Sequence, residues 1–303
     1  MPASASKTEL VKKLFWSSRP ISWINTAYPF GAAYLFETWQ QNGALNLDAN
    51  FWLGFLFFLI PYNLLMYGLN DVFDYESDLK NPRKGGIEGA LLEPRWHRPM
   101  VFWSIASCVP FLAYFAFAWK AAPLLWLAVF VFTVIAYSTQ GLRFKEIPVL
   151  DSLTSASHFV GPMIVGLSVA TGALWTPAAG LLIFAFACWG MASHAFGAIQ
   201  DIKADREGGI ASIATVFGAK STAWFVVALY LAAIGAVSFA LGWSSWPLVV
   251  VGLGYLWAVA PSVRLTDETC EESNRGWKKF LWLNMIAGFA ATILLILAML
   301  PAN

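Results

Sequence analysis

The sequence predicts an all-α membrane protein, folded as a single bundle of nine transmembrane helices over residues 1–303. The first reason is composition, since 58% of the residues are hydrophobic and the mean hydropathy is +0.61. The second is charge, since only 12% of the residues are charged, whereas soluble domains carry about 25%. The third is the presence of nine apolar stretches, each near the ~20 residues that a helix needs to cross a bilayer.

Each apolar stretch is bounded by polar or charged residues. Only Lys120 and its neighbours separate the third stretch from the fourth, and the fifth starts with the polar residues Asp151, Ser152 and Thr154. The predicted spans cover residues 20–38, 51–70, 100–118, 121–138, 149–171, 176–200, 222–241, 244–263 and 279–300.

The basic residues support this count. With nine spans, all but one of the 19 lysines and arginines fall on one side of the membrane, and Lys120 is the exception. The positive-inside rule then places that side in the cytoplasm. We therefore expect a cytoplasmic N-terminal segment at 1–19, cytoplasmic loops at 71–99 and 201–221, and a C-terminus outside the cell.

The charge and the cysteines exclude several other classes. The net charge is only +1, and the basic residues are spread over many short loops, which argues against nucleic-acid binding. Cys108, Cys188 and Cys270 lack the spacing of a metal site and imply no disulfide framework. The N-terminus shows no cleavable signal pattern.

Two clusters of aspartates carry the chemistry. Asp71, Asp74 and Asp78 have the spacing i, i+3, i+7, so on a helix they line one face. Three carboxylates on one face repel each other, and a hard divalent cation with oxygen ligands is the usual compensation. Asp201 and Asp205 follow another apolar span, at an offset of 127 residues from Asp74 and Asp78.

These clusters predict a metal-diphosphate site. Mg²⁺ prefers a few carboxylates together with phosphate oxygens and waters, so each cluster is expected to hold one ion, with Asn70 assisting the first. The alternative is that the acids are solvated charges next to the membrane. Acids at span ends are nevertheless functional candidates by default.

A diphosphate also needs cations. The first candidates are Arg143 and Lys145, in the short loop after the fourth span. The second-line candidates are Arg83, Lys84, Lys203 and Arg206. The alternative for each is a loop residue that contacts only lipid headgroups.

Three further residues have two interpretations each. Asn63 contacts either the diphosphate or a neighbouring helix. Arg19 is either a headgroup anchor or an ion-pair partner of a motif acid. His194 lies seven residues before Asp201, and either faces a reaction chamber as a proton acceptor or bonds to another helix.

The motifs resemble those of a known enzyme family. Asn70-Asp71-x-x-Asp74-x-x-x-Asp78 and Asp201-x-x-x-Asp205 are similar to the two aspartate-rich motifs of UbiA-type intramembrane prenyltransferases, and the loop with Arg143 and Lys145 resembles their diphosphate-binding loop. The resemblance covers nearly the whole chain. It implies Mg²⁺-dependent ionisation of an allylic diphosphate and capture of the carbocation by a lipophilic acceptor.

Two further stretches look most like the bacterial carotenoid branch of this family, the lycopene elongases. They begin at Ser18 and at Asn70. The resemblance implies dimethylallyl diphosphate as donor, lycopene as acceptor, the lipid bilayer as environment and other carotenoid-pathway subunits as possible partners. One departure is Gly209, which stands where many members carry a further acid.

Several alternatives stay open at this point. A different acceptor would be a quinone precursor, a chlorophyll-type ring or a glycerol lipid. A cation-coupled membrane transporter also uses paired polar sites. A non-catalytic scaffold is the third class, although it leaves both acidic clusters unexplained.

Overall fold

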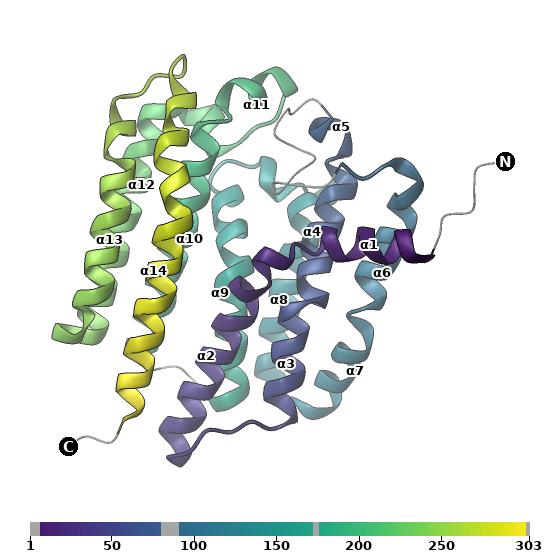
Figure 1. Cartoon of the computed structure of the whole chain (residues 1–303), viewed down its shortest axis with the longest axis vertical. Coiled ribbons are helices and arrows are strands. Elements are labelled where there is room, and N and C mark those ends of the chain that lie inside the picture. Colours follow the sequence, from purple (N-terminus) through teal and green to yellow (C-terminus); the bar gives the residue numbers. More distant parts are fainter. Residues whose placement is uncertain (1–6, 80–90, 172–175, 301–303) are drawn as a thin grey trace. The chain divides into compact units, whose positions relative to one another are not determined.

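The computed structural model of the protein describes residues 7–79, 91–171 and 176–300. All regular secondary structure in these ranges is helical, which confirms the all-α prediction (Figure 1). The described residues group into two compact units. The first comprises Met1–Leu35, Asn46–Arg143 and Gly161–Gly172, and the second comprises Phe36–Leu45, Phe144–Val160 and Ala173–Asn303.

Two helices, α2 (Trp23–Asn42) and α9 (Leu150–Thr171), are divided between the units. The first unit otherwise holds short 3₁₀ turns at Pro20–Ser22 and Pro94–Trp96 and the helices α1 (Lys7–Ser17), α3 (Ala49–Leu59), α4 (Pro61–Phe73), α5 (Tyr75–Asp78), α6 (His97–Ala106), α7 (Val109–Ala118) and α8 (Ala121–Ser138). The second holds 3₁₀ turns at Phe144–Glu146, Gly242–Ser245, Ala260–Arg264 and Cys270–Ser273 and the helices α10 (Pro177–Ile199), α11 (Ile202–Gly208), α12 (Ile213–Leu241), α13 (Trp246–Val259) and α14 (Asn274–Met299). The prediction of a single domain over 1–303 stays a prediction.

Among the described residues, seven helical segments are long and apolar enough to cross a membrane. They cover Ala49–Phe73, Pro94–Ala118, Ala121–Ser138, Leu150–Thr171, Pro177–Ile199, Ile213–Arg264 and Cys270–Met299. The difference from the nine predicted spans has two causes. The 52-residue segment Ile213–Arg264 contains both predicted spans 222–241 and 244–263, separated by a turn at Gly242. Predicted span 20–38 lies on α2, whose end Glu37–Asn42 is polar.

In the first unit, α4 is the central helix. Helices α3, α6 and α8 pack against it, and α1 lies across α4 and α6 (Figure 1). Leu10 and Leu14, one turn apart on α1, pack on a buried cluster that includes Trp96 and Met100. Helix α6 approaches closely, because a Cβ on Gly68 would lie 2.5 Å from Oγ of Ser104. Motif residues at the end of α4 therefore rest on a well-packed helix.

The break between α3 and α4 occurs at Pro61, which has no N–H and occupies the first turn of α4. Asn63 holds this break together. Its fully buried side chain donates hydrogen bonds to Oγ1 of Thr26 at 2.6 Å and to the carbonyl of Phe58 at 2.8 Å. Asn63 thus contacts neighbouring helices, the second of its two predicted interpretations.

In the second unit, α12 packs against α10 and α13, and α14 packs against α13 and α10. A Cβ on Gly190 of α10 would lie 2.9 Å from Cβ of Ala156, so α9 and α10 are also in close contact. Helix α12 begins at Ile213, where Ser212 and Thr215 form a capping box. Because α11 covers Ile202–Gly208 and α12 begins at Ile213, the region predicted as a loop at 201–221 is largely helical, with a short connection at 209–212.

Candidate active site

The first acidic motif lies where α4 ends and α5 begins. Asp71 is within α4, Asp74 is its C-cap residue with φ −99° and ψ 0°, and Asp78 ends α5. The three residues therefore do not share one uninterrupted helix, which corrects the expected single helical face. The backbone nevertheless stays nearly helical, since the amides of Asp74 and Asp78 still donate to carbonyls four residues earlier.

All three aspartates of this motif are buried, with exposures of 0%, 5% and 6%. Buried carboxylates are costly unless they are paired and hydrogen-bonded. Arg19 supplies the pairing for Asp71, through an Nη2–Oδ1 distance of 2.6 Å. The sequence left open whether Arg19 anchors headgroups or pairs with a motif acid, and the structure shows the ion pair.

The backbone at Arg19 has an unfavourable conformation. Its φ of 53° is in the left-handed region, which non-glycine residues seldom adopt. Its guanidinium also lies 5.1 Å from the ring centroid of Tyr67, one turn before Asp71. Strained residues of this kind concentrate at functional sites.

Asp74 is held by two further residues of the predicted site. Asn70 donates to Oδ2 of Asp74 at 2.6 Å and to Oγ of Ser138 at 3.0 Å, so the end of α8 joins the motif. Nη2 of Arg143 lies 3.9 Å from Oδ1 of Asp74. Arg143 again has a positive φ, 40°, and follows Gly141 with φ 88°. The predicted diphosphate ligands Asn70 and Arg143 are thus gathered at the first motif.

The other predicted residues lie elsewhere or outside the described ranges. Lys145 is half-buried on the 3₁₀ turn Phe144–Glu146. Asn63 lies two turns before Asn70 and donates its hydrogen bonds to Thr26 and Phe58. Lys84 and Arg83 lie outside the described residues.

The second acidic motif is built differently. Helix α10 ends at Ile199, Asp201 is the N-cap residue of α11, and Asp205 lies in the first turn of α11. Negative charge is favoured near a helix N-terminus. Both aspartates are half-buried. The turn at Gln200 also interrupts the stripe that the sequence predicted from His194 to Asp205.

The basic residues of the second motif contact other groups. Lys203 donates to Glu271 at 3.1 Å. Arg206 donates to the carbonyl of Thr215 and lies 2.8 Å from Oδ2 of Asp267. Asp267 accepts the backbone N–H of Ala219 at 2.8 Å, and this bond, with the Arg206 guanidinium, holds the pKa of the carboxyl below its usual range despite some burial.

The donor chemistry of the first motif fits a hard cation. Mg²⁺ is a hard cation that prefers oxygen ligands, such as those of carboxylates. In the described residues, however, no three aspartate, glutamate, histidine or cysteine side chains are gathered closely enough to hold an ion by themselves. Mg²⁺ is usually bound through one or two carboxylates, and phosphate oxygens and waters complete its coordination. The role of Asp71, Asp74, Asp78, Asp201 and Asp205 as metal ligands stays a prediction.

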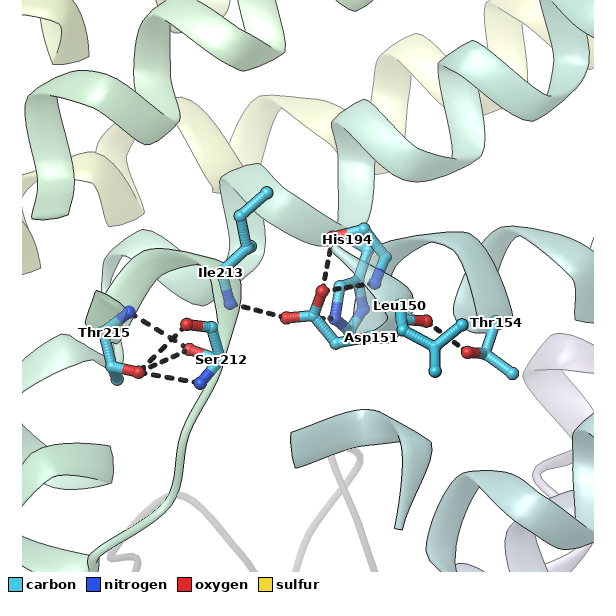
Figure 2. Close-up of polar contacts among 8 residues, drawn as sticks. Leu150, Asp151, Thr154, His194, Ser212, Ile213 and Thr215 are labelled. Carbon is cyan, nitrogen blue, oxygen red and sulfur yellow. Dashed lines mark hydrogen bonds and ion pairs between the residues drawn. The ribbon is translucent and has the colours of Figure 1, made fainter. Parts of the chain in front are cut away.

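One buried acid was not among the predicted site residues. Asp151, in the first turn of α9, is fully buried and accepts the backbone N–H of Ile213 at 2.7 Å (Figure 2). His194 on α10 faces it, with Nε2 4.0 Å from Oδ2 of Asp151. The signal was present in the sequence, because an ionisable residue within a membrane span is a functional candidate.

Comparison with known proteins identifies a matching family model and two similar proteins. The model of the UbiA prenyltransferase family matches residues 30–289. The C(50) beta-cyclic carotenoids biosynthesis protein LbtBC of Dietzia sp. is 50% identical over 287 residues, which cover 93% of this chain and 64% of that protein. The chain thus spans less than two thirds of that relative. A lycopene elongase/hydratase of Corynebacterium glutamicum is 48% identical over 290 residues, covering 95% of this chain and 98% of that protein.

The solved structures share the fold. A UbiA homolog from Archaeoglobus fulgidus bound to GPP and Mg²⁺ has a TM-score of 0.70 and 17% identity, covering 93% of this chain and 99% of that chain. The same homolog bound to DMAPP and Mg²⁺ has a TM-score of 0.67 over the same shares. Both matches show a common fold over almost the whole chain.

Proposed function

The chain belongs to the UbiA prenyltransferase family, and we propose that it transfers a dimethylallyl group from dimethylallyl diphosphate to lycopene, in the biosynthesis of longer carotenoids. The observation that carries the proposal is the buried Asp71–Asp74–Asp78 motif with its two arginines and Asn70. The choice of acceptor is supported by the C. glutamicum relative, a lycopene elongase/hydratase 48% identical over 95% of this chain. Because the family consists of prenyltransferases, the enzyme prediction is confirmed over the transporter and scaffold alternatives.

Mg²⁺ bound at the aspartates would neutralise the charge that develops on the departing diphosphate. The chain's own residues prepare this step. Arg19 pairs with Asp71 and Arg143 lies beside Asp74 before substrate arrives, and both guanidinium groups suit bidentate contact with phosphate. Asn70 fixes the carboxylate of Asp74 through one amide N–H, so the acid is oriented in advance. Asp201 and Asp205 are proposed to bind the second ion, and Lys145 and Lys84 to assist with the diphosphate.

The acceptor needs no base before it attacks. The terminal double bond of a polyene is itself the nucleophile, and its attack on the dimethylallyl cation forms a carbon–carbon bond and leaves a tertiary cation on the acceptor. We propose that water captures this cation, as the name hydratase implies for the relative. The protein is a multi-pass membrane protein, and we propose that its N-terminus and both motifs face the cytoplasm, as the basic residues predict. Association with other carotenoid-pathway subunits stays a prediction.

The test is a transfer assay in membranes that carry the protein. They would be incubated with labelled dimethylallyl diphosphate, Mg²⁺ and lycopene, and the carotenoids separated by chromatography. We expect label in products longer than lycopene, lost with a chelator and restored by added Mg²⁺. Membranes without the protein are the control. Label that moves only into a different lipid would reject lycopene as acceptor, and label that stays on diphosphate with every acceptor would reject the proposed function.

A further inference from the structure

Two residues of one short segment, 138–143, act on the carboxylate of Asp74, one directly and one through Asn70. Nη2 of Arg143 lies 3.9 Å from Oδ1 of Asp74. The other oxygen, Oδ2, accepts a hydrogen bond from Nδ2 of Asn70 at 2.6 Å, and the same nitrogen donates to Oγ of Ser138 at 3.0 Å. Ser138 is the last residue of α8 and is 1% exposed. All four residues belong to the first compact unit.

The amide of Asn70 has one orientation that fits these neighbours. A carboxylate only accepts hydrogen bonds, so the NH₂ end of the amide must face Oδ2 of Asp74. The second N–H of the same group then has Oγ of Ser138 as its acceptor. Both donors of the amide are therefore satisfied, and turning the amide away from Asp74 would break two hydrogen bonds.

This orientation leaves the amide oxygen of Asn70 accessible. In the part of the chain that the structure describes, Oδ1 of Asn70 accepts no hydrogen bond, and it is not among the polar atoms that are buried without a partner. The side chain is half-buried, so solvent reaches this oxygen. A hard cation or its bound waters prefer oxygen ligands of this kind. The hydroxyl of Ser138 thus helps to hold both a carboxylate and an accessible oxygen of the predicted site.

The turn that follows α8 sets the separation between Ser138 and Arg143. The N–H of Arg143 donates to the carbonyl of Thr139 at 3.0 Å. The turn uses positive φ values at Gly141 and Arg143, 88° and 40°. Such a value is uncommon for a residue other than glycine and persists where the surrounding structure holds it in place. The end of α8 and its turn therefore bring Ser138 and Arg143 to Asp74 together.

We propose that Ser138 is a positioning residue of the first motif. Its hydroxyl holds the amide of Asn70, and the amide in turn fixes Asp74 and keeps its own oxygen available to the cation. This inference rests on the proposed function, because it concerns the metal-diphosphate site of that reaction. Ser138 itself contacts neither ion nor substrate. Packing of α8 against α4 would be served equally by alanine, so the role belongs to the hydroxyl.

The loss of such a hydroxyl should act on metal binding. Residues that hold a metal ligand in place typically contribute about 10- to 100-fold to metal affinity or activity. Without the Ser138 hydroxyl, one N–H of Asn70 has no acceptor and the amide can rotate away from Asp74. This cost falls on the binding of the ion, before the C–O bond of the donor breaks. The concentration of metal that the enzyme needs should therefore rise, whereas the rate at saturating metal should change less.

The test is the binding of Mn²⁺ in the presence of inorganic diphosphate, followed by electron paramagnetic resonance of the detergent-solubilised protein. Mn²⁺ takes the same kinds of oxygen ligand as Mg²⁺, and this measurement needs neither acceptor nor turnover. In Ser138→Ala we expect the dissociation constant of at least one bound Mn²⁺ to rise by about 10-fold. In the transfer assay, the Mg²⁺ concentration for half-maximal rate should rise by about the same factor, while kcat at saturating Mg²⁺ changes much less.

Ser104→Ala is the matched control. Ser104 is also a buried serine bonded to α4, since its hydroxyl donates to the carbonyl of Leu64 at 3.1 Å, but it lies on α6 and reaches α4 six residues before Asn70. This variant should lower the unfolding midpoint and leave Mn²⁺ binding unchanged. Ser138→Cys is the second variant if Ser138→Ala does not fold, because sulfur is only a weak acceptor.

A double variant shows whether Ser138 acts through Asn70. Asn70→Ala alone should weaken Mn²⁺ binding at least as much as Ser138→Ala does. When Ser138→Ala is added to Asn70→Ala, we expect no further loss, because the amide that the hydroxyl holds is already absent. Losses that simply add would show two separate effects and would overturn the positioning role.

The remaining outcomes separate this inference from the proposed function. Unchanged Mn²⁺ binding in folded Ser138→Ala overturns the inference, as does an equal loss of binding in Ser104→Ala. Failure of both Ser138 variants to fold would show a structural residue and would also overturn it. If the wild type binds Mn²⁺ with diphosphate but transfers no label to lycopene, the proposed reaction fails, and weaker binding in Ser138→Ala still supports the positioning role. If the wild type binds no Mn²⁺, the metal site and this inference fail together.

Discussion

The two acidic motifs share the spacing Asp-x-x-x-Asp but have different surroundings. In the first, the aspartates are at least 94% buried and are contacted by Arg19, Asn70 and Arg143. In the second, Asp201 and Asp205 are half-buried, and the neighbouring bases Lys203 and Arg206 contact Glu271 and Asp267. Similar sequence patterns thus give one motif that is buried and contacted by two arginines, and one that is half-buried and has neighbouring bases paired with Glu271 and Asp267.

This difference predicts how each motif responds to change. Removing charge from a buried, paired cluster disturbs both binding and packing, because the remaining partner is left uncompensated. Removing charge from the contacts around the second motif disturbs exposed pairs, which contribute little each. The largest effects are therefore expected at the first motif and the smallest around Arg206.

Replacing Asp71 by Asn should have the largest effect. The change keeps the volume but removes a metal-binding charge and the partner of Arg19. Metal stabilisation of a leaving group is worth several kcal/mol, so transfer should fall by about 1,000-fold. Labelled transfer per folded enzyme is the measurement. Asp48→Asn is the control: it removes a carboxylate that caps α3 away from the motif, where Asp48 accepts the N–H of Phe51 at 2.9 Å, and because Asn caps a helix about as well as Asp, specific activity should stay close to wild type. Equal specific activities of the two variants would contradict the assignment of Asp71.

Replacing Arg19 by Gln tests whether the first motif is balanced by its own cation. Breaking a buried pair from one side costs about 3 kcal/mol or more, and the unfolding midpoint in detergent should drop accordingly. In the double variant with Asp71→Asn, most of this loss should disappear, which a double-mutant cycle measures. Mg²⁺ with diphosphate should raise the midpoint more in Arg19→Gln than in wild type, because bound cations replace the missing charge. If the stability losses of Arg19→Gln and Asp71→Asn simply add in the double variant, the two side chains are not energetically coupled.

Replacing Asn63 by Ala should affect stability alone. Asn63 is as buried as Asp71 and lies on the same helix, yet its partners are Thr26 and the carbonyl of Phe58. Leaving these groups unsatisfied costs about 1–3 kcal/mol. The unfolding midpoint should fall, while the KM for dimethylallyl diphosphate stays within about twofold of wild type, a shift below 0.5 kcal/mol. A large rise in KM with unchanged stability would return Asn63 to the diphosphate site.

The sequence predicted the class of fold and much of the first motif, for physical reasons. Hydropathy follows the bilayer directly, so the long apolar helices were found, although two predicted spans lie in the one segment Ile213–Arg264 and predicted span 20–38 is not among the membrane-length segments. Asn70 and Asp74 were grouped correctly because they are one turn apart, a separation that a local helix fixes. The pairing of Arg19 with Asp71 across 52 residues was only one of two alternatives, since tertiary packing decides it.

What could not be predicted depends on breaks in helices. The helices α4 and α10 end at Asp74 and Gln200, and neither of these two residues is a proline or glycine. A helical spacing of residues in the sequence does not show where such a helix ends, so the predicted helical faces continued past both turns. Asp151 was noted only as part of a polar helix start. Its significance depends on Ile213, 62 residues away, whose N–H has no signature in sequence.

The smallest effect is expected from Asp267→Asn, beside the second motif. Asp267 caps the long part of α12 from another loop, where Gly218 with φ 79° interrupts the helix and Ala219 donates its N–H to the carboxylate. This hydrogen bond keeps the pKa of Asp267 below its ordinary value, so the carboxylate form is favoured by folding. Its contribution, about 1 kcal/mol for one hydrogen bond to a charged group at a partly exposed site, is complete above the unfolded pKa of about 3.9 and is lost as pH falls through the folded pKa.

Wild type and Asp267→Asn should therefore differ in unfolding midpoint at pH 7 and converge as the pH drops below about 4. Thermal unfolding in detergent between pH 3 and pH 7 measures this, within the range in which the detergent-solubilised wild type unfolds reversibly. Specific activity at pH 7 should change little. The reason is that the contrast between the motifs gives the exposed contacts around Arg206 no part in binding the diphosphate. A loss of activity as large as that of Asp71→Asn would show that the second motif depends on its own fixed cation network, as the first does, and the contrast between the two motifs would no longer hold.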